Sequence, residues 1–271
     1  MWHDIIELRN FYQSRSGRIA QRLLRRDLRR IWPRVGPGET LLGLGYATPF
    51  LRPFLGEAGR VVAAMPAPQG GHVWPPEGPN LVALVEEFEL PYPDQSIDRL
   101  VMVHALEFAP AAQTLLRECW RVLRPSGRMV VVVPNRRGIW ARVDRTPFGH
   151  GNPYSAGQIT RLLHRSMFVT GTAETALFAP PAERGLGLRV AGPLERFGRR
   201  WLPAVGGVVI IEAQKQVYAA TPPGGRRVPA RVAVAGRLAP SGRRRPAWAP
   251  GRGVAGVASA PPADAGDTGP D

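Results

Sequence analysis

The apolar positions of residues 1–32 recur with the period of an α-helix. The series runs from Ile5 through Leu8 and Tyr12 to Ile31, and arginines occupy much of the remaining surface. Ser14 and Gly17 weaken the middle of the pattern, and Pro33 ends it. The segment therefore predicts an amphipathic helix that is either continuous or split in two.

Beyond residue 38, short apolar runs alternate with helical stretches. The runs predict strands over 40–44, 60–65, 80–84, 98–104 and 128–134, and helices over 49–55, 110–123 and 155–164. The stretches 168–179 and 208–218 predict a terminal antiparallel pair. Continuously apolar strands separated by helices are typical of a mostly parallel sheet covered on both faces. We therefore expect a doubly wound, seven-stranded α/β fold whose ligand lies at the carboxyl ends of the parallel strands.

Composition divides the chain into three parts. Residues 1–35 are the basic helical segment, and residues 36–218 carry the α/β pattern. Residues 219–271 are dominated by Ala, Pro, Gly and Arg without a sustained apolar period. Such a segment cannot bury enough apolar surface to offset the entropy of ordering it. We expect a disordered basic tail.

The formal net charge of +15 is concentrated at the two ends of the chain. Residues 1–35 hold nine arginines against three acids, and residues 219–271 hold eight against three. Basic ends can attract RNA or an anionic membrane. Because Lys215 is the only lysine, a chain-wide bias toward arginine explains the same charge. Both interpretations remain open at this stage.

The chain holds one cysteine, Cys119, and five scattered histidines. An intramolecular disulfide is therefore excluded, and no metal site is expected. Asp4 and Glu7 leave no uninterrupted apolar run near the N-terminus, so this segment does not resemble a signal peptide. No apolar run approaches the ~18 residues that span a bilayer. These features favour a cytoplasmic protein.

A more specific pattern lies in residues 89–128. Residues 90–98 read Leu-Pro-Tyr-Pro-Asp-Gln-Ser-Ile-Asp, and residues 103–107 read Val-His-Ala-Leu-Glu. Residues 118–123 read Glu-Cys-Trp-Arg-Val-Leu and are followed by Pro-Ser-Gly. Asp94 and Ser96 suit a tight turn before a strand, which Asp98 begins, and the Pro-Ser-Gly sequence at 125–127 breaks the helix. We expect Asp94, Asp98 and Arg121 each to maintain structure.

This pattern closely resembles class I S-adenosylmethionine-dependent methyltransferases of the small-molecule type, specifically the methyltransferase type 11 group, as a divergent bacterial member. The resemblance implies a Rossmann-like fold with S-adenosyl-L-methionine as cofactor. It also implies that particular residues bind that cofactor, namely Gly43, Gly45, Tyr46, Ala47, Met65, Glu86, Glu87 and His104.

The first strand and its loop depart from the family pattern, which reads Asp-x-Gly-x-Gly-x-Gly. Gly43 replaces the acid, Gly45 is retained, and Ala47 and Pro49 replace two glycines. Alanine is tolerated where φ is negative, and proline suits the first turn of a helix. The loop can therefore form, with an altered shape around the cofactor.

The second strand departs further. Met65 stands where the family places an acid that accepts both ribose hydroxyls. The loss of one charged hydrogen bond costs about 1.5–3 kcal/mol, or ten- to a hundredfold in affinity. Glu86 or Glu87 follows the third strand, where the resemblance implies an acid near the adenine; a solvated loop carboxylate is the alternative.

Candidate substrate contacts follow the fourth and fifth strands. His104 either lines the site or is a satisfied core histidine. The loop 135–155 is rich in polar and aromatic residues and is expected to cover the mouth of the site as a substrate or cofactor lid; a packing loop is the alternative. Its candidate substrate residues are Asn135, Arg136, Trp140, His150 and Tyr154. His104, His150 and Tyr154 are the candidate catalytic bases.

The sequence leaves three functional hypotheses open. The leading one is methyl transfer to an acceptor, with a small molecule ahead of a lipid headgroup or a protein side chain. The second is an inactive methyltransferase-like domain that acts as a binding or regulatory module, suggested by Gly43, Ala47, Pro49 and Met65. The third is a weak RNA or membrane binder that acts through the basic ends.

Overall fold

The computed structural model describes residues 4–181, 191–202 and 204–217. Its helices are α1 (Ile5–Gln13), α2 (Arg15–Ile31), α3 (Thr48–Leu51), α4 (Ala112–Val122), α5 (Ala156–Arg165) and α7 (Ala191–Trp201). Its strands are β1 (Thr40–Gly45), β2 (Arg60–Pro66), β3 (Val82–Val85), β4 (Ile97–Val103), β5 (Leu123–Pro134), β6 (Phe168–Thr170), β7 (Glu174–Ala176) and β8 (Val208–Lys215). Short 3-10 turns include η2 (Ala67–Gln69) and η4 (Pro147–Gly149).

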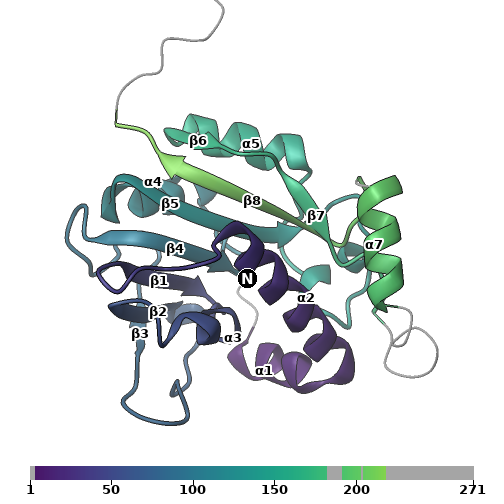
Figure 1. The fold of residues 1–271 in the computed structure, drawn as a ribbon, viewed down its shortest axis with the longest axis horizontal. Coiled ribbons are helices and arrows are strands. Elements are labelled where there is room, and N and C mark those ends of the chain that lie inside the picture. The colour runs from purple at the N-terminus through teal and green to yellow at the C-terminus, as the bar shows by residue number, and fades with distance from the viewer. Residues whose placement is uncertain (1–3, 182–190, 203, 218–271) are drawn as a thin grey trace, which may run out of the picture. The chain divides into compact units, whose positions relative to one another are not determined.

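One sheet joins all of these strands in the order β3-β2-β1-β4-β5-β8-β6, and β7 also pairs with β8 (Figure 1). Strands β1 to β5 are parallel, whereas β8 is antiparallel to β5, β6 and β7. The expected Rossmann-like α/β class is confirmed. The strand count is eight because the stretch 168–179 forms two short strands instead of one.

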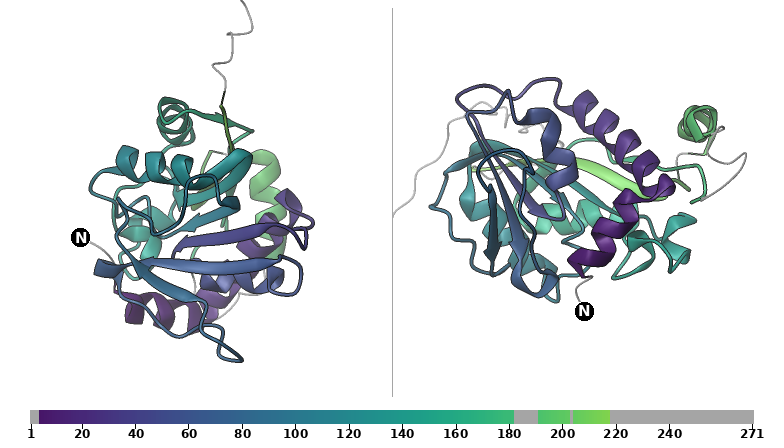
Figure 2. Two further views of the ribbon diagram at one scale, coloured as in Figure 1. Left: turned by 90° about the vertical axis from the view of Figure 1, so that its left-hand side faces the viewer. Right: turned by 90° about the horizontal axis from the view of Figure 1, so that it is seen from below.

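Helices cover both faces of the sheet, as the apolar strands predict. In β5, Val130 and Val132 pack into the cluster that contains α1 and α2, while Val131 and Val133 pack into the cluster that contains α4 and α5. Figure 1 shows α2 crossing in front of the sheet and α4 behind it. The same layers can be followed in Figure 2. Alternate side chains therefore bury on opposite faces.

The N-terminal segment is two helices that break at Ser14. The Ser14 hydroxyl accepts a hydrogen bond from the Gly17 amide and caps α2. A Cβ atom at Gly17 would lie 2.0 Å from the Phe11 carbonyl oxygen. Because only glycine fits this close approach, the sequence positions that weaken the helical pattern mark the actual junction.

The motif that carries the family resemblance is mainly structural, as expected. Arg121 donates hydrogen bonds to the carbonyl oxygens of Leu90 and Tyr92 and to the carboxylates of Asp94 and Glu118. The hydrogen bond from Arg121 holds the pKa of Glu118 below its usual value. These bonds fasten the turn before β4 to the end of α4.

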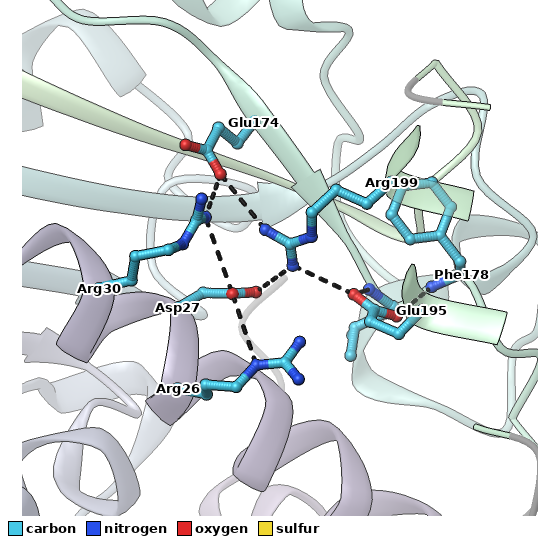
Figure 3. A network of polar contacts seen from close by, with 8 residues as sticks. Arg26, Asp27, Arg30, Glu174, Phe178, Glu195 and Arg199 are labelled. Atoms are coloured by element: carbon cyan, nitrogen blue, oxygen red, sulfur yellow. Dashed lines mark hydrogen bonds and ion pairs between the residues drawn. The ribbon is translucent and has the colours of Figure 1, made fainter. Parts of the chain in front are cut away.

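An ion-pair network joins α2 to β7 and α7 (Figure 3). Asp27 of α2 is nearly fully buried and pairs with Arg199 of α7 at 2.7 Å. Arg199 also pairs with Glu174 of β7 and with Glu195 of α7. Glu195 is itself buried and accepts hydrogen bonds from the amides at 177 and 178. Three separate chain segments are thereby joined.

The expected division at residues 35 and 218 stays a prediction, and the expected tail, 219–271, lies outside the described residues. Apolar residues of α1 and α2 belong to the same core cluster as β1, β2 and β5. Among the helices that the structure describes, none combines the length and apolar character that a bilayer crossing requires.

Candidate cofactor site at the carboxyl edge of the sheet

Gly45 ends β1 with a positive φ of 79°. A Cβ atom there would lie 2.4 Å from the Val103 carbonyl oxygen and 2.9 Å from that of His104. The retained glycine of the family loop is thus required by its close approach to β4 as well as by its backbone conformation.

Gly45→Ala is expected to destabilise the fold by about 2–3 kcal/mol, because it combines a left-handed alanine with a backbone clash. Urea unfolding provides the measurement. Gly56→Ala is the matched control, since a Cβ atom at Gly56 meets nothing within 4 Å. Equal midpoints for the two variants would contradict this role for Gly45.

Gly43 lies inside β1 and is fully surrounded. A Cβ atom there would lie 2.5 Å from Leu51 Cδ1 and 2.8 Å from the Ala47 Cβ. Ala47 itself is buried and precedes α3, which begins with Pro49 in its first turn. The absence of the family's acid therefore has a packing reason: α3 lies against the space that the acid would fill.

The end of β2 is filled by apolar and amide groups. Met65 is fully buried in the core and offers no strong acceptor. Gln69, in η2, reaches across to β4, where its Nε2 atom donates to the His104 carbonyl oxygen at 2.9 Å. Sequence reasoning missed Gln69, because nothing in its local pattern marks it.

The two candidate acids after β3 point differently. Glu86 is exposed and pairs its backbone with Glu89, whereas Glu87 is 4% exposed. The Glu87 Oε2 atom has no hydrogen-bond partner among the described residues. Of the two expected acids, Glu87 is the one turned into the protein.

His104 is fully buried at the end of β4, with a positive φ of 52°. Its Nε2 atom lies 2.8 Å from the Tyr12 hydroxyl, and its Nδ1 atom lies 3.1 Å from Glu107 Oε1. An ionised Glu107 can only accept, so Nδ1 then carries the proton and Nε2 of the neutral ring accepts from Tyr12. The three side chains form one buried chain of hydrogen bonds.

Helix α1 covers this edge. The Tyr12 ring stacks on Tyr46, with centroids 5.5 Å apart, and both rings are nearly fully buried. Burial raises the pKa of Tyr46 to about 12, and burial also raises the pKa of Tyr12 well above its usual value. Tyr12 was expected only as an apolar helix position. Its role depends on a contact with His104, 92 residues away, which no local pattern reveals.

The loop 135–155 lies over the ends of β4 and β5. Phe148 contacts the His104 ring, with centroids 4.8 Å apart, and the Asn152 amide donates to the Glu107 carbonyl oxygen. Asn135 and Trp140 are buried and donate to carbonyl oxygens of residues 179, 204 and 206, so both anchor the loop. The expected position is present, but these two side chains serve packing.

The remaining loop candidates lie farther out. Arg136 is exposed and donates to the Pro153 carbonyl oxygen. The His150 Nε2 atom lies 2.6 Å from the Asp144 carbonyl oxygen; since a carbonyl only accepts, this nitrogen donates and is not a free base. Tyr154 is half-buried, and burial followed by the charge of Glu107 raises its pKa. His104 is therefore the candidate base best joined to the strand ends.

Three buried oxygen acceptors at this edge have no partner among the described residues. They are Gln69 Oε1 after β2, Glu87 Oε2 after β3 and Glu107 Oε2 after β4. Buried polar atoms are normally hydrogen-bonded, so each of these acceptors calls for a donor from ordered water or from a ligand. The residues that the structure describes contain no cluster suited to a metal ion.

Residues 45–131 match the protein family described as Methyltransferase domain. Two probable S-adenosylmethionine-dependent methyltransferases of Mycobacterium tuberculosis are 36% identical over 108 residues, which is 39% of this chain and 39% of each relative. A counterpart from Mycolicibacterium smegmatis is 37% identical over 82 residues, or 30% of this chain and 32% of that relative. The chain thus aligns with well under half the length of these relatives.

Solved structures share the fold. An S-adenosylmethionine-dependent methyltransferase from Thermotoga maritima superposes with a TM-score of 0.55 at 17% identity and covers 78% of this chain and 96% of that one. One from Archaeoglobus fulgidus gives a TM-score of 0.52 at 19% identity, with 76% and 96% covered. Over residues 45–131 the chain is therefore similar to S-adenosylmethionine-dependent methyltransferases, and the described residues share their Rossmann-like fold.

Proposed function

We propose that this chain transfers the methyl group of S-adenosylmethionine to a small-molecule acceptor. The family match supports the reaction, and one observation at the site carries the proposal: the unpartnered acceptors at the ends of β2, β3 and β4. S-adenosylmethionine carries amino and hydroxyl donors, so Gln69, Glu87 and Glu107 are the residues that would hold it. They substitute for the acids absent at Gly43 and Met65.

The cofactor supplies a methyl group already activated on its sulfonium, so catalysis rests on holding a nucleophile in line with it. The chain's own contribution is the exclusion of water and the control of one proton. Glu107 orients the His104 ring, and His104 Nε2 is the nitrogen able to accept a proton once the Tyr12 hydroxyl leaves it.

Helix α1 closes the site in this structure, since Tyr12, Tyr46 and Gln69 fill the space over the strand ends. Cofactor binding therefore requires α1 to move. A ligand that binds a minor open state has an apparent affinity lowered by the fraction of that state. A substitution that destabilises the closed state therefore raises the fraction of the open state and the apparent affinity for the cofactor.

Calorimetry with S-adenosylmethionine and S-adenosylhomocysteine tests this proposal on the full chain. Tyr12→Phe leaves the buried His104 Nε2 atom without its partner in the closed state and is expected to tighten cofactor binding about tenfold. Tyr92→Phe is the matched control, because it removes another buried tyrosine hydroxyl that has no partner among the described residues. Methyl-labelled cofactor should then deliver its label to a small-molecule fraction.

The second candidate is an inactive binding module. The filled space over the strand ends and the apolar residues at Gly43 and Met65 favour it. It replaces the first proposal if neither ligand binds the native chain or Tyr12→Phe at millimolar concentration. A cytoplasmic location, and RNA or membrane contact through the basic ends, stay predictions.

A further inference from the structure

A pocket of about 650 Å³ lies beside Tyr46, between the N-terminal helices, the start of α3 and the loop that follows η2. Its volume is within the range of small-molecule sites. Arginines from three separate elements line it: Arg9 of α1, Arg25 of α2 and Arg52 after α3. His72 adds an imidazole, and the described residues that line the pocket include no acid.

The positive charges in this pocket are poorly neutralised. The Arg9 guanidinium has no ion-pair or hydrogen-bond partner among the described residues. The Arg25 Nε atom donates a hydrogen bond to the Pro49 carbonyl oxygen at 2.6 Å, which does not neutralise its charge. Arg52 pairs with Glu77 at 3.1 Å, but these side chains are 48% and 70% exposed. An exposed pair of this kind contributes little and is screened by salt.

The pKa values reflect the same crowding of charge. Burial, and then the nearby charge of Arg52, lowers the pKa of Arg25. Burial, and then the charge of Arg9, lowers the pKa of His72. Like charges are therefore held together in a concave site, which a bound anion would stabilise.

The walls between these charges are aromatic. Tyr12, Tyr46 and Trp74 line the pocket, and the buried Nδ1 atom of His72 has no partner among the described residues. An organic molecule with a strongly charged end matches such a lining. Arginine is the residue best suited to phosphate oxygens, because its planar fork donates two parallel hydrogen bonds.

We propose that this pocket binds the phosphate or diphosphate group of the methyl acceptor, so that the substrate is a phosphorylated small molecule. This substrate class rests on the methyltransferase function proposed above. The pocket lies next to the covered cofactor site, since Tyr12 lines the pocket with its ring and contacts His104 with its hydroxyl. The carboxylate of the cofactor itself is the other possible source of an anion here.

Calorimetry with inorganic pyrophosphate tests the pocket without requiring any acceptor. We expect binding to the full chain that weakens with salt, and a loss of about ten- to a hundredfold in Arg9→Gln and in Arg25→Gln. Arg22→Gln is the matched control: it removes the same charge from α2 at an exposed position outside the pocket lining. Its affinity should equal that of the native chain.

Each outcome decides the assignment. Absent binding, or equal weakening in all three variants, overturns the pocket as an anion site. Competitive displacement of pyrophosphate by free methionine, which carries the cofactor's carboxylate without the nucleoside that would move α1, assigns the arginines to the cofactor carboxylate and overturns the acceptor assignment. Simultaneous binding of both ligands supports it. If the native chain binds pyrophosphate but binds neither S-adenosylmethionine nor S-adenosylhomocysteine, the methyltransferase function is contradicted and the anion site is not. The two failures are therefore distinguishable.

Discussion

Gly43→Asp, which restores the acid of the family pattern, is expected to destabilise the domain by about 4 kcal/mol and to leave cofactor binding no tighter. The new side chain would meet Leu51 and Ala47 at its first carbon, in a position where β1 is fully buried. A carboxylate there would be enclosed at a buried strand position, so the cost of removing it from water would oppose folding.

Urea unfolding and cofactor calorimetry measure the two parts of this prediction. Gly43→Ala is the matched control, since it introduces the same steric overlap without the charge and should cost about 1–3 kcal/mol. If Gly43→Asp were as stable as the native chain and bound S-adenosylmethionine more tightly, the packing explanation for the missing acid would be wrong.

Asp27→Ala is expected to lower the free energy of unfolding by about 3–5 kcal/mol, the second large effect. Asp27 is 3% exposed at its side chain and lies within 4.0 Å of three arginines, Arg26, Arg30 and Arg199 (Figure 3). Its removal leaves Arg199, which is 29% exposed, in a partly buried position without its nearest carboxylate.

Thermal and urea unfolding of the full chain provide the measurement, and Arg26→Ala is the control. Arg26 belongs to the same network, but its side chain is 53% exposed and its contact with Asp27 is 4.0 Å long. Arg26→Ala is expected to change the free energy of unfolding by no more than about 0.5 kcal/mol. Similar losses for Asp27→Ala and Arg26→Ala would show that burial of the ion pair is not the cause.

The sheet was largely predictable because its strands are locally distinctive. The valine run of β5 and the turn before β4 indicate their own structure. Arg121 has the structural role expected of it, and its contacts with that turn come from the structure. The stretch 168–179 was harder, since a short break between two paired segments leaves no clear period.

The site was less predictable, because its determining contacts are distant in sequence. Tyr12 reaches His104 from α1, and Gln69 reaches the same residue from η2, the turn that follows β2. The meaning of Gly43 also depends on Leu51, a packing partner that no family pattern specifies. Asn135 and Trp140 looked like substrate contacts from their chemistry, but their hydrogen bonds go to backbone carbonyls.

The break at Ser14 has a kinetic consequence. Asp27 fastens α2 to α7, so a swing at the break would carry Arg9 and Tyr12 away while Arg25 and Arg52 keep their places. The arginine pocket is then complete only after α1 has returned over the strand ends. Since α1 must leave the strand ends before a nucleoside can enter, an anion bound in the complete pocket is expected to hold α1 in place and to slow the binding of the nucleoside.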